Sequence, residues 1–67
     1  PMNQAIEKAV EIAGGQSSLA RALGVSQPRV WNWLHKSQIS PEFVIPVEKV
    51  TGVSRHELRP DIYPRNE

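Results

Sequence analysis

The chain has 67 residues, with 8 Lys and Arg against 7 Asp and Glu, so its formal net charge is +1 at pH 7. A chain of this length buries only about 60% of its unfolded surface and is too small to enclose a typical enzyme pocket as a monomer. We therefore expect a single domain, residues 1–67, that is not an enzyme. It contains no Cys, which excludes disulfide bonds and thiolate metal sites. No apolar run approaches the roughly 20 residues of a membrane-spanning helix, and no signal-peptide pattern is visible, so we expect a cytoplasmic protein.

The charges are unevenly distributed along the sequence. Residues 14–41 contain no Asp or Glu, whereas Arg21, Arg29 and Lys36 give this segment three positive charges. The rest of the chain carries five cations and seven acids. A cation-only segment is the electrostatic footprint expected of phosphate binding, although chance segregation on a solvated face would give the same pattern.

The residues from Asn3 to Ala13 are predicted to form the first helix. Asn3 is suited to cap its N-terminus, and Gly14-Gly15 ends it. We assign these two glycines to C-capping, because no phosphate-loop pattern follows them. The apolar residues recur at helical spacing and form one face: Ile6, Ala9, Val10 and Ala13.

The next twenty residues, 16–35, are predicted to form a helix-turn-helix, with helices at 17–23 and 27–35. Gly24 lies at the corner, where we expect positive φ, and the Ser26 hydroxyl is expected to cap the second helix. Pro28 falls in the first turn of that helix, where its missing N–H removes no intrahelical bond. Each helix has one apolar face: Leu19, Ala20 and Leu23 on the first, and Val30, Trp33 and Leu34 on the second.

This spacing resembles the helix-turn-helix of Cro- and CI-type phage repressors. Ala20 supplies the small residue at the fifth position of that motif, and Gly24 supplies the glycine at the ninth. Apolar residues fill the other positions that the motif requires: Leu19, Leu23, Val25, Val30 and Trp33. A plain helical hairpin, the alternative, does not need Ala and Gly at those two positions. The resemblance implies an all-α, lambda-repressor-like DNA-binding domain of five short helices, with helix 27–35 in the major groove.

The resemblance also implies which residues contact DNA. Gln16 is expected to touch a phosphate and to support Gln27, the first residue of the recognition helix. Gln27 and Asn32 carry amides that can pair with base edges. Trp33 occupies a core position, whereas Trp31 points outward, either to DNA or to a neighbouring loop. The predicted base-reading residues are Gln27, Pro28, Trp31 and Asn32, with Arg29 on their flank; the predicted phosphate contacts are Gln16, Ser17, Arg21 and Lys36.

A fourth helix is predicted to begin at Ser40-Pro41-Glu42, with Ser40 as its N-cap, and to end at Thr51-Gly52. Pro46 lies inside it and cannot donate a hydrogen bond to the Glu42 carbonyl, so we expect a bend there. One face of this helix is expected to be apolar: Val44, Val47 and Val50.

The last part of the chain, residues 54–64, is expected to form a short helix and an extended tail. Ser54 and Glu57 match a capping box for a helix at 55–59. Ile62 and Tyr63 are apolar enough that we expect the tail to fold back onto the core. The run SRHELRPDIYP resembles the YdaS-like branch of Cro/CI-type regulators, so the resemblance covers nearly the whole chain. Such proteins are small prophage-encoded transcriptional regulators, and some are described as antitoxins. The run either only caps and docks the last helix or contacts DNA or a partner.

The function that the sequence predicts is operator binding by a Cro-like repressor of phage or prophage genes in a bacterial host. One recognition helix contacts few base pairs, so we expect a weak homodimer or a dimer that forms on DNA. Two alternatives stay open: an antitoxin-type module that binds a toxin or other partner protein, and an RNA or single-strand binder. We expect no cofactor. We expect no metal site either, because His35 has only His56 as a possible histidine partner and the chain has no Cys.

Overall fold

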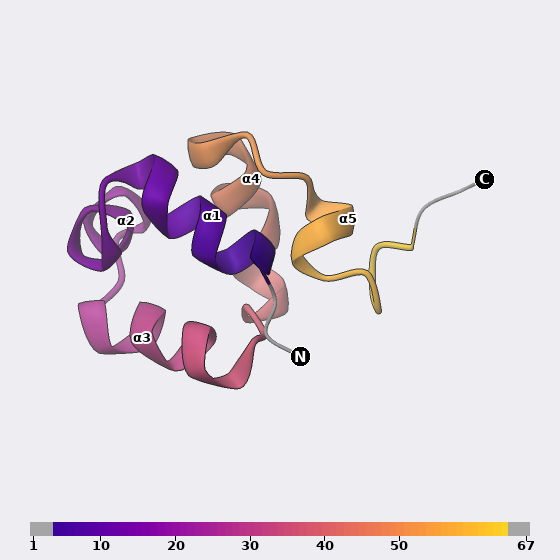
Figure 1. Cartoon of the computed structure of the whole chain (residues 1–67), viewed down its shortest axis with the longest axis horizontal. Coiled ribbons are helices and arrows are strands. Elements are labelled where there is room, and N and C mark those ends of the chain that lie inside the picture. The colour runs from indigo at the N-terminus through magenta and orange to yellow at the C-terminus, as the bar shows by residue number, and fades with distance from the viewer. Residues whose placement is uncertain (1–3, 65–67) are drawn as a thin grey trace.

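The computed structural model describes residues 4–64, and every regular element in this range is helical. The elements are α1 (Gln4–Ala13), α2 (Gln16–Leu23), α3 (Gln27–Lys36), the 3₁₀ turn η1 (Pro41–Phe43), α4 (Val44–Thr51) and α5 (Arg55–Leu58). α3 forms one side of the molecule, α1, α2 and α4 pack together beside it, and α5 lies at the far end of the molecule (Figure 1). The predicted all-α fold of five short helices around a helix-turn-helix is therefore confirmed. None of these helices has the length and apolar character needed to cross a bilayer. The predicted cap at Asn3 lies outside the described residues.

The corner between α2 and α3 has the predicted backbone but not the predicted cap. Gly24 is in the left-handed conformation, φ 74°, and ends α2. The Val25 N–H then donates to the Ala20 carbonyl at 2.9 Å, as is common at such helix ends. The expected cap by the Ser26 hydroxyl is wrong. A cap hydroxyl binds the N–H of the second or third helical residue. The second is Pro28, which has none, and the N–H of Arg29 donates to the Ser26 carbonyl at 3.1 Å instead.

The core is a small apolar cluster to which all five helices contribute. Trp33 is 4% exposed, as predicted, and its indole N–H donates to the Ser40 hydroxyl at 3.3 Å. That hydroxyl therefore serves Trp33, and Ser40 makes no side-chain cap on the helix that follows. The cluster consists of Ile6, Ala9, Leu19, Ala20, Val30, Trp33, Ile39, Val44, Val47, Val53 and Leu58.

The predicted fourth helix divides into η1 and α4. The change from 3₁₀ to α geometry falls between Phe43 and Val44, so Pro46 lies in the first turn of α4. Backbone N–H groups in the first turn have no intrahelical acceptor, so the N–H that Pro46 lacks removes no helical hydrogen bond. The prediction placed the irregularity at Pro46 itself, and the structure places it two residues earlier. Val44 and Val47 are buried as predicted, but Val50 is exposed and does not belong to the buried face.

The run 54–64 caps and docks the last helix. The Ser54 hydroxyl accepts the N–H of His56 at 3.1 Å, which confirms the N-cap of α5. The Glu48 carboxylate accepts the backbone N–H and the Nε–H of Arg55, both at 2.9 Å, and these hydrogen bonds lower the pKa of Glu48. Tyr63 packs against the core as predicted, whereas Ile62 is 42% exposed, so the prediction that it covers the core is wrong.

Arg59 is buried, which the sequence did not predict. Its side chain is enclosed between the tail and the loop after α3, and the residue is only 8% exposed. Nη1 donates to the Ile39 carbonyl at 2.6 Å, while Nε and Nη2 donate to the two carboxylate oxygens of Asp61 at 2.9 and 2.7 Å. The charge of the buried guanidinium is thus paired, and its donors join the tail to the loop. The same two hydrogen bonds lower the pKa of Asp61 to about 2.

Asp61 should make the fold sensitive to acid. Because its pKa is lower in the folded chain than the ordinary value of 3.8, ionised Asp61 stabilises the fold above about pH 4. That contribution should be lost as the pH falls from about 4 to about 2. Urea unfolding of the wild type and Asp61→Asn at several pH values measures it: the difference in free energy of unfolding should shrink over this interval. Glu42→Gln removes an exposed acid and is the control for the lost charge. A difference that stays constant down to pH 2 would contradict the prediction.

Candidate nucleic-acid interface

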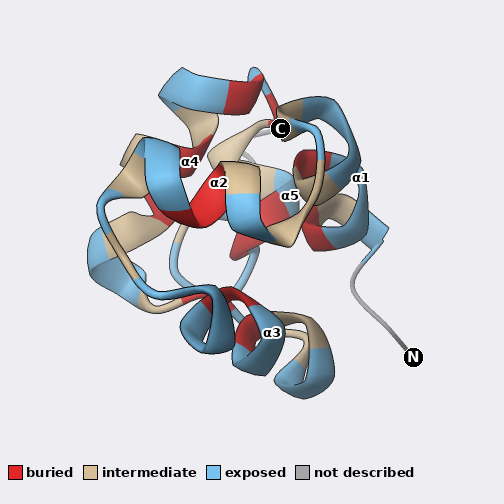
Figure 2. Ribbon diagram, turned by 90° about the vertical axis from the view of Figure 1, so that its left-hand side faces the viewer, coloured by how far each residue is buried: buried red, intermediate tan, exposed pale blue. Residues whose placement is uncertain are grey.

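α3 presents one face to the core and the other to solvent. Val30 and Trp33 are buried against the other helices, and the outward side of α3 is exposed (Figure 2). All the predicted base-reading residues are on exposed positions of α3, so the helix offers a continuous polar and aromatic surface to a partner. They are Gln27, Pro28, Arg29, Trp31 and Asn32.

Gln16 and Gln27 are joined across the helix-turn-helix. Gln16 is the first residue of α2 and Gln27 the first of α3, and Gln27 Nε2 donates a hydrogen bond to Gln16 Oε1. This is the contact that the motif predicts. The amide of Gln27 is fixed in orientation by it, and Gln27 keeps its own amide oxygen and a second N–H for another partner. The contact of Gln16 with a phosphate stays a prediction.

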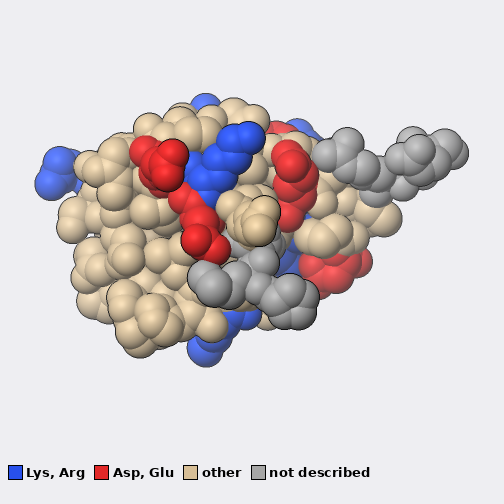
Figure 3. All heavy atoms as spheres, viewed as in Figure 1, with Lys and Arg blue, Asp and Glu red and all other residues tan. Residues whose placement is uncertain are grey.

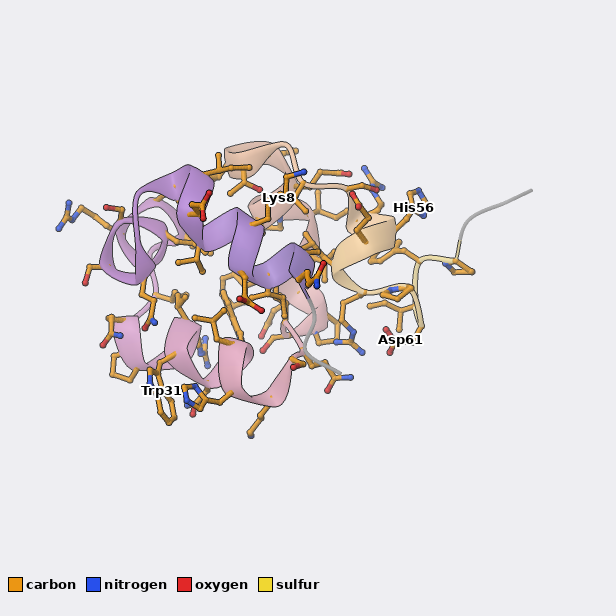
Figure 4. The ribbon with its side chains drawn as sticks, viewed as in Figure 1. Lys8, Trp31, His56 and Asp61 are labelled. Atoms are coloured by element: carbon orange, nitrogen blue, oxygen red, sulfur yellow. The ribbon has the colours of Figure 1, made fainter. Side chains whose placement is uncertain are left out.

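Trp31 and His35 form a stacked pair on the outer side of α3. Their ring centroids are 3.5 Å apart with an interplanar angle of 23°. His35 Nδ1 lies 3.0 Å from the carbonyl oxygen of Trp31, and since a carbonyl can only accept, Nδ1 carries the proton in this contact. Trp31 is 45% exposed and extends from α3 away from the other helices (Figure 4). Its ring stacks on a residue of the same helix, and its contact with DNA stays a prediction.

The predicted phosphate contacts are exposed or half-buried and lie at the edges of the α2–α3 unit. Ser17 is in the first turn of α2, Arg21 in its last turn, and Lys36 is the last residue of α3. Within the described residues, no hydrogen bond or ion pair joins Arg21 to Gln16 or Lys36, so the structure does not bring Arg21 into one cluster with them. Where α3 lies in Figure 3, the visible face shows Lys and Arg but no Asp or Glu.

Arg29 lies on the flank of α3 that faces η1. Its guanidinium carbon is 5.6 Å from the centroid of the Phe43 ring, within the range of a cation–π contact. A groove of about 330 Å³ opens beside it, between α3 and the loop that leads to η1. The groove is lined by Arg29, Asn32, Trp33, Lys36, Gln38, Ser40, Pro41 and Arg59.

The exposed face of α3 and the groove also include residues that were not in the predicted sites: Trp33, His35, Gln38, Ser40, Pro41 and Arg59. The i, i+4 spacing of Trp31 and His35 on an exposed helical face could have indicated their stacking. Gln38 and Arg59 carry no such signal, because they reach the groove only through the loop and the tail. Lys8 lies on α1, and His56 and Asp61 lie by α5, at the other end of the molecule from Trp31 (Figure 4).

Two comparisons with known proteins match most of the chain. The family model described as "Bacterial toxin YdaS" matches residues 6–67. A protein of Escherichia coli (strain K12) named "Putative transcriptional regulator YdaS" is 41% identical over 63 residues, a match that covers 90% of this chain. The match covers 64% of that protein, so the chain spans less than two thirds of the relative's length. No solved structure matches the chain.

Proposed function

The chain belongs to the YdaS family, and we propose that it binds double-stranded DNA in a sequence-specific manner, as a Cro-like repressor of phage or prophage operators. The observation that carries the proposal is the α2–α3 unit. It joins two helices through a left-handed Gly24, links their first residues by the Gln16–Gln27 hydrogen bond, and exposes the outer face of α3. The name of the E. coli relative, which calls it a regulator of transcription, supports the same function.

In the proposed complex, α3 lies in the major groove and contacts of two kinds act together. Gln27 and Asn32 offer amide donors and acceptors that match the edge of adenine, and Trp31 offers an apolar ring for a thymine methyl group. Residues at the ends of the two helices bind phosphates and set the orientation of α3 without reading sequence: Gln16, Ser17, Arg21 and Lys36. All the Lys and Arg residues of segment 14–41 belong to the α2–α3 unit, and this segment contains no Asp or Glu.

Selection of bound duplexes from a random DNA pool tests this function directly. We expect a common sequence to emerge, and we expect affinity for it to fall steeply as salt rises, because phosphate contacts release counterions. The binding constant measured at several salt concentrations by fluorescence anisotropy gives the number of phosphate contacts. A pool that converges on no sequence would contradict sequence-specific binding.

We also propose that the repressor acts as a dimer. One recognition helix reads too few base pairs to select an operator, so two copies should bind a palindrome with half-site centres about 34 Å apart, one turn of DNA. The expected result is cooperative binding to the palindrome, with weak self-association in solution. Titration onto the palindrome and onto one half-site, with sedimentation of each complex, measures this. Equal affinity per half-site, with only monomers on DNA, would show that the dimer proposal is wrong.

The family description, which names a toxin, is compatible with a second candidate function. In it the chain is an antitoxin-type module that binds a toxin or another protein directly. Salt dependence separates the two functions, since protein contacts release few counterions and phosphate contacts release many. Binding to random-pool DNA that is weak and insensitive to salt would favour the second candidate.

A further inference from the structure

We propose that the groove between α3 and the 37–41 loop holds a backbone phosphate of the DNA strand opposite to the one that Gln16 contacts. This inference rests on the proposed DNA binding and assigns a second phosphate site to it. It also gives Arg29 a different role from the base-flanking one that the sequence predicted.

The lining of the groove suits an anion. Arg29 and Lys36 place two positive charges at its exposed edge, the Gln38 amide adds a neutral donor, and none of the described residues that line it is an acid. Arg59 forms part of the wall with its charge already paired to Asp61. A phosphate oxygen in this groove would therefore meet charged donors, whose hydrogen bonds to phosphate are stronger than those of neutral donors.

The groove lies on the side of α3 away from Gln16. At about 100° per residue, Arg29 and Lys36 are displaced by about 180–200° around α3 from Gln27, the residue bonded to Gln16. A helix in the major groove has one sugar-phosphate strand on each side. The Gln16 side of the unit therefore faces one strand, and the groove faces the other.

Arg29 is held where it can donate to a phosphate. The guanidinium lies over the face of the Phe43 ring, and Phe43 in turn packs 5.5 Å from Trp33 in the core. A guanidinium placed over a ring face keeps its N–H groups for a bidentate contact with two phosphate oxygens. The same contact places Arg29 toward η1, which favours a contact with a DNA phosphate over one with the base edges.

The opposite wall of the groove is fixed by the fold. Ser37 ends α3 in a left-handed conformation, φ 55°, and the N–H of Gln38 donates to the Trp33 carbonyl at 3.0 Å. The following residue, Ile39, is fully buried, and its carbonyl accepts from Arg59, which lines the groove. A site whose two walls are held in this way needs little ordering when it binds, which favours affinity.

Methylphosphonate substitution tests the site. On the selected duplex, single phosphates of each strand are replaced by neutral methylphosphonates, and the Kd is measured for the wild type and Arg29→Ala. Arg29→Ala should weaken binding to the selected and to random duplexes alike, by roughly tenfold at 0.1 M salt, and lower the salt slope by about one unit. A methylphosphonate at one position should weaken binding of the wild type but not weaken binding of Arg29→Ala any further. A methylphosphonate at another position should show the same coupling to Gln16→Ala. The two positions should lie on opposite DNA strands.

Two matched variants sharpen the test. Arg29→Lys keeps the charge but loses the planar fork, so it should retain the salt slope and recover only part of the affinity. Gln38→Ala should weaken binding without changing the salt slope, because it removes a neutral donor. Circular dichroism confirms that each exposed substitution leaves the helices intact.

The outcomes are separable. If selection converges but Arg29→Ala loses affinity only for the selected duplex, or is coupled to no phosphate, the groove site is wrong while the proposed function stands. If selection does not converge, the proposed function fails first, and this inference fails with it. A free phosphate ion has the same chemistry as the DNA phosphate. The methylphosphonate scan distinguishes the two sources, because only a DNA phosphate in the groove makes binding by Arg29→Ala insensitive to one methylphosphonate position.

Discussion

Trp33→Ala is expected to cost about 3–5 kcal/mol of the free energy of unfolding and to leave the protein mostly unfolded. The indole is almost fully buried, packs against Phe43 and donates its N–H to Ser40, so its removal leaves a cavity and an unmatched hydroxyl. A chain of this length has a total stability of only about 3–10 kcal/mol, at about 0.05–0.15 kcal/mol per residue. Urea unfolding followed by circular dichroism at 222 nm measures the loss.

Trp31→Ala is the matched control, since it removes the same side chain from the same helix. Trp31 is exposed and stacks only on His35, so this variant should unfold within about 0.5 kcal/mol of the wild type. DNA binding, in contrast, should be weakened by it. A urea curve in which Trp31→Ala is the more damaging substitution would reverse the two assignments.

Much of the fold could be predicted because local chemistry and the core agree on it. The spacing of Leu19, Ala20 and Leu23 requires a helix, and Gly24 allows the left-handed residue that ends it, so the corner follows from sequence alone. Trp33 could be assigned to the core, and Trp31 to the surface, from the 3.6-residue period of α3. The Gln16–Gln27 hydrogen bond followed from the resemblance to the Cro/CI motif rather than from period or propensity.

The two wrong side-chain caps, at Ser26 and Ser40, depended on neighbouring residues that a cap pattern does not include. Serine is a typical N-cap residue at both positions. Pro28 lacks the N–H that the Ser26 hydroxyl would accept, and the Ser40 hydroxyl accepts the Trp33 indole N–H instead of a helical N–H. Such competition depends on residues that meet only in the folded chain. Arg59 is the clearest case: its acceptor at Ile39 lies 20 residues away, so nothing local indicates that this cation is buried. The groove, which depends on that loop, could not be predicted for the same reason.

The second large effect is expected on DNA binding. Gln27→Ala should weaken binding to the selected duplex by about 1–3 kcal/mol, with little change on random DNA, because a base-reading amide distinguishes sequences and a phosphate contact does not. Asn32→Ala, which also removes an exposed amide of α3, should behave alike. Lys36→Ala is the contrasting variant: it should weaken binding to both duplexes and lower the salt slope by about one unit.

Gln16→Ala separates orientation from direct contact. If the hydrogen bond from Gln27 to Gln16 holds the Gln27 amide in place for a base, Gln16→Ala should lose part of the discrimination at the base that Gln27 reads, in addition to a phosphate contact. The double variant should then discriminate no worse at that base than Gln27→Ala alone, because the two residues act through one amide. Anisotropy titrations with duplexes substituted at each operator position measure this coupling. Losses that are equal on selected and random DNA for Gln27→Ala would remove Gln27 from the base-reading residues, and additive losses in the double variant would show that Gln16 acts on DNA independently.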